Sequence, residues 1–152
     1  MSEIEPLSHE LVARSLKGQG LNYLRTPDDR FKLEYRPDEA SGATLTAWLW
    51  VEGPNQDILD IWVVADKRFP RSEWGRMIML CNQWNNEKRW PKAYLATRGL
   101  PDTATDTGVV LELQLKLSSG LQIESIDEWY NMVVGGAYQF WRWIKEQSQP
   151  AS

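Results

Sequence analysis

Two consecutive apolar stretches decide the fold. They are Ala43–Glu52, which reads ATLTAWLWVE, and Asp57–Ala65, which reads DILDIWVVA. Both are rich in β-branched and aromatic residues, which favour strands. The Gly-Pro-Asn at 53–55 between them is typical of a turn. The pattern therefore predicts a β-hairpin, which we place at the centre of a sheet.

Further elements flank this hairpin on both sides. Alternation of apolar and polar residues predicts four more strands: Leu21–Arg25, Phe31–Arg36, Lys92–Thr97 and Val109–Leu117. Helical spacing of apolar residues predicts three helices: Ser8–Lys17, Pro70–Glu87 and Ile126–Glu146. The order α-β-β-β-β-α-β-β-α, with short turns between sequential strands, indicates the α+β class. We expect an antiparallel sheet of about five to six strands flanked by the helices.

The ends and faces of the helices carry recognisable signals. Ser8 is a good N-cap, and Gly18 suits the left-handed position that closes a helix. Ser125 and Glu128 have the spacing of a capping box. The second helix has one apolar stripe, which we expect to face the core: Trp74, Met77, Ile78, Cys81 and Trp84 or Asn85.

Length and composition indicate one soluble domain. The 152 residues, with a net charge of −4, form a single domain with an ordered core over about 7–146. We expect frayed ends at Met1–Pro6 and Gln147–Ser152. The polar N-terminus is unlike a signal peptide, and no apolar run is long enough to cross a bilayer. We therefore expect a cytoplasmic protein that has no membrane partner.

The residues that usually carry catalysis do not form a constellation. His9 lies in the first turn of a helix, where we expect a solvated side chain, and Cys81 fits a buried thiol. Asp102 and Asp106 lie in a loop without the spacing of a calcium site, so we interpret them as turn residues. The sequence predicts no catalytic residue, no cofactor and no metal site, and hence no enzyme.

Charge is unevenly distributed. Lys67–Arg98 carries eight basic and two acidic residues, so this segment is +6 and the rest of the chain is −10. Such a surface suits an acidic partner or association of the chain with itself. An ordinary solvated helix is the alternative. The acidic balance of the whole chain argues against nucleic-acid binding.

Nine tryptophans stand out in the composition. We expect the tryptophans on strands and in the second helix to be mostly core residues: Trp48, Trp50, Trp62, Trp74 and Trp84. The last helix is different, because apolar residues cover nearly its whole circumference, whereas a surface helix shows one stripe. It needs a second covering surface besides the sheet. That surface is another subunit, a client protein or another helix of the same chain.

Gly135 and Gly136 lie inside this last helix, and each weakens it by roughly 1 kcal/mol relative to alanine. Close approach of another backbone explains such glycines, and a kink is the alternative. We take as candidate interaction surface the aromatic residues of this helix and a preceding Arg-Trp pair: Trp129, Tyr138, Trp141, Trp143, Arg89 and Trp90.

Residues Cys81–Leu95, which read CNQWNNEKRWPKAYL, resemble the signature of the YbjN-like family. In that family a helix ending in an N-x-W-N-like motif leads through an Arg-aromatic pair into a K-A-Y strand. Alternating leucines at Leu111–Leu115, a glycine turn and a long aromatic helix extend the resemblance over essentially the whole chain. The additional tryptophans and the long loop at Arg98–Gly108 suggest a specialised branch, which we expect to be cyanobacterial.

The resemblance implies a type III secretion chaperone-like fold that is often dimeric. It also implies a role in sensory-transduction regulation, with no established enzymatic activity. The signature has a structural interpretation as well, because Asn82, Asn85 and Asn86 suit the end of a helix and Pro91 prevents its continuation. We therefore favour a helix-to-strand corner over a ligand site for this segment.

The sequence favours a non-enzymatic protein-interaction or chaperone-like regulatory module, which we expect to be a homodimer that binds a protein partner. The alternative is a small-ligand or carbohydrate-binding domain that uses Trp90, Trp48 or Trp50 as stacking platforms. An enzyme is the third hypothesis, and a pocket with converging carboxylates of shifted pKa would support it.

Overall fold

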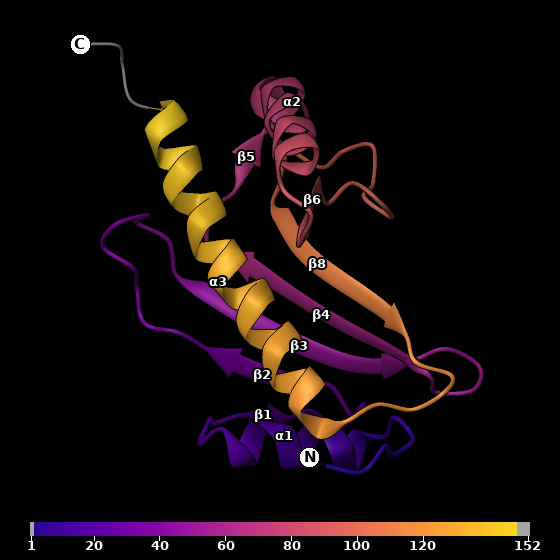
Figure 1. Ribbon diagram of the computed structural model, residues 1–152. Helices are drawn as coiled ribbons and strands as arrows, with labels where there is room; N and C mark the ends of the chain where they lie inside the picture. Colours follow the sequence, from indigo (N-terminus) through magenta and orange to yellow (C-terminus); the bar gives the residue numbers. More distant parts are fainter. Residues whose placement is uncertain (1, 149–152) are drawn as a thin grey trace.

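Six strands form one antiparallel sheet in the order β1-β2-β3-β4-β8-β6 (Figure 1). They are Leu24–Arg25 (β1), Phe31–Glu34 (β2), Leu45–Glu52 (β3), Ile58–Ala65 (β4), Val109–Lys116 (β8) and Lys92–Leu95 (β6). The computed structural model describes residues 2–148. It confirms the α+β class and the predicted order of the main elements, to which it adds the short pair Phe69–Pro70 (β5) and Asp106–Thr107 (β7).

The predicted central hairpin is confirmed. Strands β3 and β4 pair over all eight residues, from Leu45 opposite Ala65 to Glu52 opposite Ile58. The turn between them places Gly53 at a φ of 92°, which is the left-handed region that favours glycine. With β2 on one side and β8 on the other, the hairpin forms the middle of the sheet.

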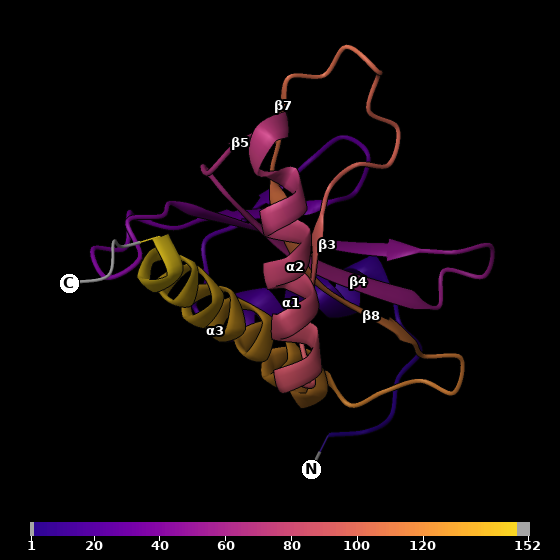
Figure 2. The ribbon, with the colours of Figure 1, turned by 90° about the horizontal axis from the view of Figure 1, so that it is seen from above.

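Three helices cover one side of this sheet and one of its edges: His9–Gly18 (α1), Arg71–Glu87 (α2) and Ile123–Ser148 (α3). Helix α3 crosses β4 and β8, and α1 packs against α3 and β3. Helix α2 lies along β6, and Figure 2 shows it from above, nearest the viewer. None of the helices within residues 2–148 is both long and apolar enough to cross a bilayer.

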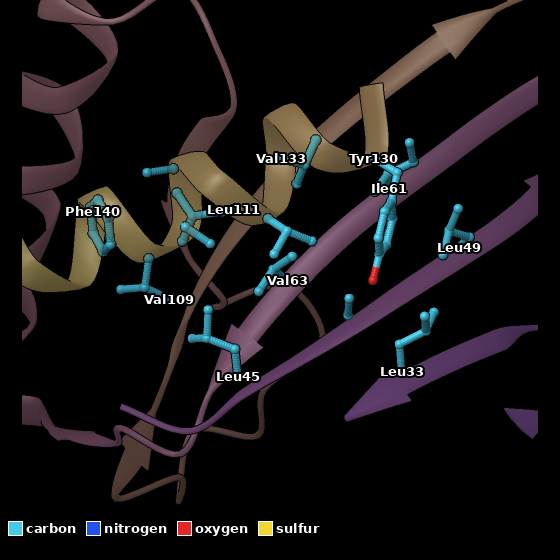
Figure 3. Packing of buried hydrophobic residues seen from close by; sticks show 14 of the residues in the cluster. Leu33, Leu45, Leu49, Ile61, Val63, Val109, Leu111, Tyr130, Val133 and Phe140 are labelled. Atoms are coloured by element: carbon cyan, nitrogen blue, oxygen red, sulfur yellow. The ribbon is translucent and has the colours of Figure 1, made fainter. Parts of the chain in front are cut away.

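The core lies between α3 and the sheet. Leucine, isoleucine and valine side chains of β2, β3, β4 and β8 point toward Tyr130, Val133 and Phe140 of α3 (Figure 3). Alternate residues of β3 take part, since Leu45 and Leu49 are buried and Thr46 and Trp48 are only half-buried. This burial of apolar surface is the main driving force for the fold. It also fixes which strand residues face away from the helices.

Two predicted helix ends are wrong. Ser8 caps α1 as predicted, but Gly18 is still helical, and Gly20 takes the left-handed position with a φ of 72°. Helix α3 begins at Ile123, so Ser125 lies inside the helix and forms no capping box. The early start follows from a bridge in which Leu121 exchanges two backbone hydrogen bonds of 2.9 Å with Glu5.

The same bridge holds part of the N-terminal segment that was expected to fray. The fraying expected at 149–152 lies outside the described residues. In α2 the predicted stripe is partly wrong, because Ile78 is 54% exposed and Leu80 is buried in its place beside Met77, Cys81 and Trp84. The reason is that α2 packs against both β6 and α3, which rotates the buried stripe toward Leu80.

Candidate interaction surface

The aromatic side chains at the end of α3 are covered by the chain itself. Trp141 is only 2% exposed and stacks on Phe69 with 6.1 Å between ring centroids, so its expected place on an interaction surface is wrong. Trp143 is half-buried and packs against Trp84 of α2 and Phe140, at 6.1 and 6.0 Å. Another subunit, a client protein and another helix of the same chain were the possible covering surfaces for α3. The structure shows the third, because α2 covers part of α3.

The other candidate residues are separated from one another. Trp129 is half-buried against the core, and Tyr138 packs edge-on against Tyr35 with 6.1 Å between centroids. Arg89 and Trp90 lie between α2 and β6, where Trp90 is 48% exposed. The predicted set therefore does not form one continuous exposed surface.

The Asn-rich segment forms a helix-to-strand corner. The amide of Asn85 donates to the Ala93 carbonyl at 3.0 Å and accepts from the Ala93 N–H at 2.9 Å. The indole Nε1 of Trp84 donates to the Pro91 carbonyl at 2.9 Å. Asn85 therefore satisfies backbone groups on the outer edge of β6, a position that would otherwise invite pairing with another chain. No asparagine caps α2, whose C-cap is Lys88.

Gly136 is the residue at which α3 meets this corner. A Cβ atom built there would lie 2.5 Å from Cδ of Pro91, closer than carbon atoms pack. Gly135, the preceding residue, has nothing within 4 Å of its own would-be Cβ. A close approach is therefore present at Gly136 alone, and it is made by the Pro91 ring rather than by the expected backbone, whose nearest atom, Pro91 N, lies 3.8 Å away.

The sheet face opposite α1 and α3, which we call the open face, carries no helix within residues 2–148 (Figures 1 and 2). One row of its side chains lies in register across all six strands: Leu24, Lys32, Trp48, Trp62, Glu112 and Lys92. Beside it, Trp50 of β3 is opposite Asp60 of β4, which is opposite Gln114 of β8. The open face thus presents tryptophans in the middle and charges toward both edges.

The tryptophans of the open face pack on each other and on cations. Trp48 and Trp62 stack with 5.9 Å between centroids and 7° between planes. The Arg30 guanidinium lies 4.2 Å from the centroid of Trp50, and Lys32 Nζ lies 5.5 Å from that of Trp48. Such contacts each contribute about 0.5–1 kcal/mol at exposed sites. They hold the rings half-buried on a face that faces solvent.

Asp60 and Glu112 form a buried acidic pair on the open face, 5% and 7% exposed. Gln114 Nε2 donates to Oδ2 of Asp60 at 3.2 Å, whereas Oδ1 is buried and receives no donor within the described residues. Burial, followed by the hydrogen bond with Glu112, raises the pKa of Asp60 to about 8. Asp60 therefore holds a proton at neutral pH.

Cys81 and Asp106, which were considered from the sequence as possible chemical groups, have structural roles. Cys81 is buried, and burial raises the pKa of its thiol to about 11, so the thiol is unreactive. The Asp106 carboxylate pairs with Arg68 at 2.7 Å, and Arg71 Nε donates to the Ala104 carbonyl at 2.6 Å. Basic residues near the start of α2 thus hold the loop before β8.

The open face was missed in the sequence because the tryptophans of this face were placed in the core, on the basis of their size and hydrophobicity. A signal for it is nevertheless present in β3, where Trp48 and Trp50 alternate with Leu45, Ala47 and Leu49. Three apolar residues of one parity define the core face, so both tryptophans belong to the other face. The expected core position of these two tryptophans, and of Trp62 opposite Trp48 on β4, is therefore wrong.

Comparison with known proteins adds a family and a fold. The family model YbjN, described as "Putative bacterial sensory transduction regulator", matches residues 8–146. The crystal structure of Escherichia coli YbjN, described as "a putative transcription regulator", is similar with a TM-score of 0.74. The match covers 97% of this chain and 100% of that chain at 11% identity, so it supports the fold alone. No curated protein matches this sequence.

Proposed function

Since this chain belongs to the YbjN family, whose model spans residues 8–146, we propose that it is a non-enzymatic regulatory module. It acts by binding another protein chain through the open face of its sheet. The cytoplasmic location and the cyanobacterial origin stay predictions from the sequence.

The observation that carries this proposal is the composition of the open face. An antiparallel sheet with one solvated face normally carries polar residues there. Here Trp48, Trp50 and Trp62 occupy the centre of that face, and Tyr94 lies on the edge strand β6. Tryptophan, tyrosine and arginine are the residues most enriched at the energetic centres of protein interfaces.

A catalytic role for the acidic pair is less favourable. Five surface cavities of about 290 to 640 Å³ occur in the described residues, and neither Asp60 nor Glu112 lines any of these five. A substrate that needs general acid catalysis must reach the proton it receives. Asp60 and Glu112 are only 5% and 7% exposed, so a substrate has little access to them. They fit a surface that another chain covers.

Binding of a small ligand or carbohydrate is also less favourable than binding of a protein. Stacking of a sugar needs a free ring face, and cations of the same chain already lie over Trp48 and Trp50. Trp90 is exposed but lines none of the five cavities. A protein partner needs a broad surface, and the open face offers one around its tryptophans. A cavity at the β1–β2 edge is lined by Leu24, Lys32 and Glu34, whereas none of the five cavities is lined by Trp48, Trp50 or Trp62.

Photo-crosslinking at matched positions tests the proposal. A photoreactive amino acid is placed at Val64, which is half-buried on the open face, and at Glu128, which is exposed on α3. We expect adducts with a second protein chain in cells of the source organism from position 64 and not from 128. The adduct at 64 should disappear when Trp48 is also replaced by serine. Equal adducts at both positions, or none at 64, would contradict the proposal.

A further inference from the structure

We infer that a second copy of this chain docks face to face on the open face, about a two-fold axis parallel to the strands between β3 and β4. The inference rests on the proposed function, because it names the chain that the open face binds. Lys32 of each copy then faces Glu112 of the other copy.

The axis follows from the order of the strands. The sheet has three strands on each side of the β3–β4 boundary. Rotation about an axis along this boundary exchanges β2 with β8 and β3 with β4, and it leaves the position along the strands unchanged. The row that crosses all six strands therefore faces the same row of the second copy, with the strand order reversed. Strand β1 faces β6 of the second copy, β2 faces β8, and β3 faces β4. Two sheets packed in this way form an aligned sandwich with about 10 Å between them.

The charges along this row are complementary under that rotation. Lys32 on β2 meets Glu112 on β8 of the second copy, and Trp48 meets Trp62. The exposed Leu24 on β1 lies over the stem of Lys92 on β6. A two-fold axis across the strands would instead lay Lys32 on Lys32 and Glu112 on Glu112. Of these two axes, the one along the strands pairs opposite charges.

The acidic pair is incomplete in a single chain. Within residues 2–148, Oδ1 of Asp60 is buried without a donor, and the only cation paired with Glu112 is Lys92, with 3.4 Å between Nζ and Oε1. In the dimer, Lys32 of the second copy faces Glu112, and Arg30 of the second copy faces Gln114 beside Asp60. Two cations then approach the two carboxyl groups. The second copy thus adds positive charge beside Glu112, which within residues 2–148 of one chain is paired with Lys92 alone.

The area of the open face suits such a dimer. Three strands of eight residues and three of two to four, spaced about 4.8 Å apart with a rise of about 3.3 Å per residue, form a face of roughly 540 Å². That is on the order of the 800 Å² per partner that a stable complex buries. The tryptophans at its centre are then enclosed by charged pairs at the rim, the arrangement found at interface hot spots.

Charge reversal tests this geometry. K32E and E112K are prepared separately, and sedimentation velocity measures their association and that of the unmodified chain. The unmodified chain should sediment as a dimer. Each variant places like charges together twice in its own dimer, so we expect its association to weaken about tenfold or more.

An equal mixture of K32E and E112K restores both pairings. The two substituted side chains carry opposite charges and face each other at one contact, while the native Lys32 and Glu112 face each other at the symmetry-related contact. The mixture should therefore form dimers that neither variant forms alone.

Controls keep the outcome interpretable. E128K makes the same charge change on exposed α3 and should leave association unchanged. If circular dichroism shows that E112K does not fold, E112Q replaces it. The E112Q variant should dimerise more weakly than the unmodified chain, because Lys32 loses its opposite charge. The double variant K32E/E112Q should dimerise better than K32E, because the substitution removes the like charge that faces position 32. A monomeric unmodified chain, or a mixture no more dimeric than its components, overturns the inference. Crosslinks from Val64 to a different protein would then still support the proposed function.

Discussion

Replacing Gly136 by alanine perturbs the contact between α3 and the α2–β6 corner. The new Cβ would lie 2.5 Å from Cδ and 3.2 Å from Cγ of Pro91. These atoms belong to a ring that cannot rotate away, so α3 or the corner must shift. Overpacking of this kind costs about 1–3 kcal/mol. Alanine in place of glycine inside a helix returns about 1 kcal/mol, so the net change lies between neutral and a loss of about 2 kcal/mol.

Gly135→Ala is the matched control for this perturbation. It makes the same change one residue earlier, where nothing lies within 4 Å of the new Cβ, and should stabilise the chain by up to about 1 kcal/mol. The propensity gain is common to both variants and cancels in their difference. We therefore expect Gly136→Ala to be less stable than Gly135→Ala by about 1–3 kcal/mol.

Urea denaturation followed by circular dichroism measures this difference, and thermal melting gives a second reading of about 2–4 °C per kcal/mol for a chain of this size. Equal stability of the two alanine variants would refute the packing of α3 on Pro91. Lower stability of Gly135→Ala would refute the helix register, because it would mean that the other glycine faces the corner.

Three further changes test other parts of the structure. Asn85→Ala removes both side-chain bonds to the β6 backbone and should cost about 1–3 kcal/mol in urea denaturation, whereas the exposed Asn86→Ala should change little. Asp60→Asn should gain stability over the unmodified chain by about 1.4 kcal/mol per pH unit between pH 4 and 8, because the folded chain holds a proton there that the unfolded chain releases. Parallel stability-against-pH curves for Asp60→Asn and the unmodified chain would contradict the proton on Asp60. Cys81 should react with a thiol reagent at pH 8 only after unfolding, and rapid reaction of the folded chain would contradict its burial.

Local patterns predicted the elements better than their ends. The β3–β4 hairpin follows from alternation and turn chemistry within 43–65, which need no information from the rest of the chain. The start of α3 could not be predicted in the same way. It depends on the bridge between Glu5 and Leu121, residues that are far apart in the sequence. The exposure of Ile78 depends likewise on where α2 packs.

The candidate site shows the same division. The apolar circumference of α3 correctly indicated a second covering surface, but only the tertiary fold shows that Trp84 of α2 provides part of it. The parity of Trp48 in β3 was readable from the sequence. The pairing of Asp60 with Glu112 was not, because it requires the register between β4 and β8. Periodicity gives the face of a strand, whereas the neighbours on that face are set by non-local pairing.

The most direct test of the central claim is hydroxyl-radical footprinting of the tryptophans as chain concentration is raised through the range of self-association. If the open face is the interaction surface, Trp48, Trp50 and Trp62 lose reactivity on association, while Trp129 and Trp143 of α3 keep theirs. Protection of Trp129 and Trp143 with unchanged reactivity of the open-face tryptophans would contradict the account.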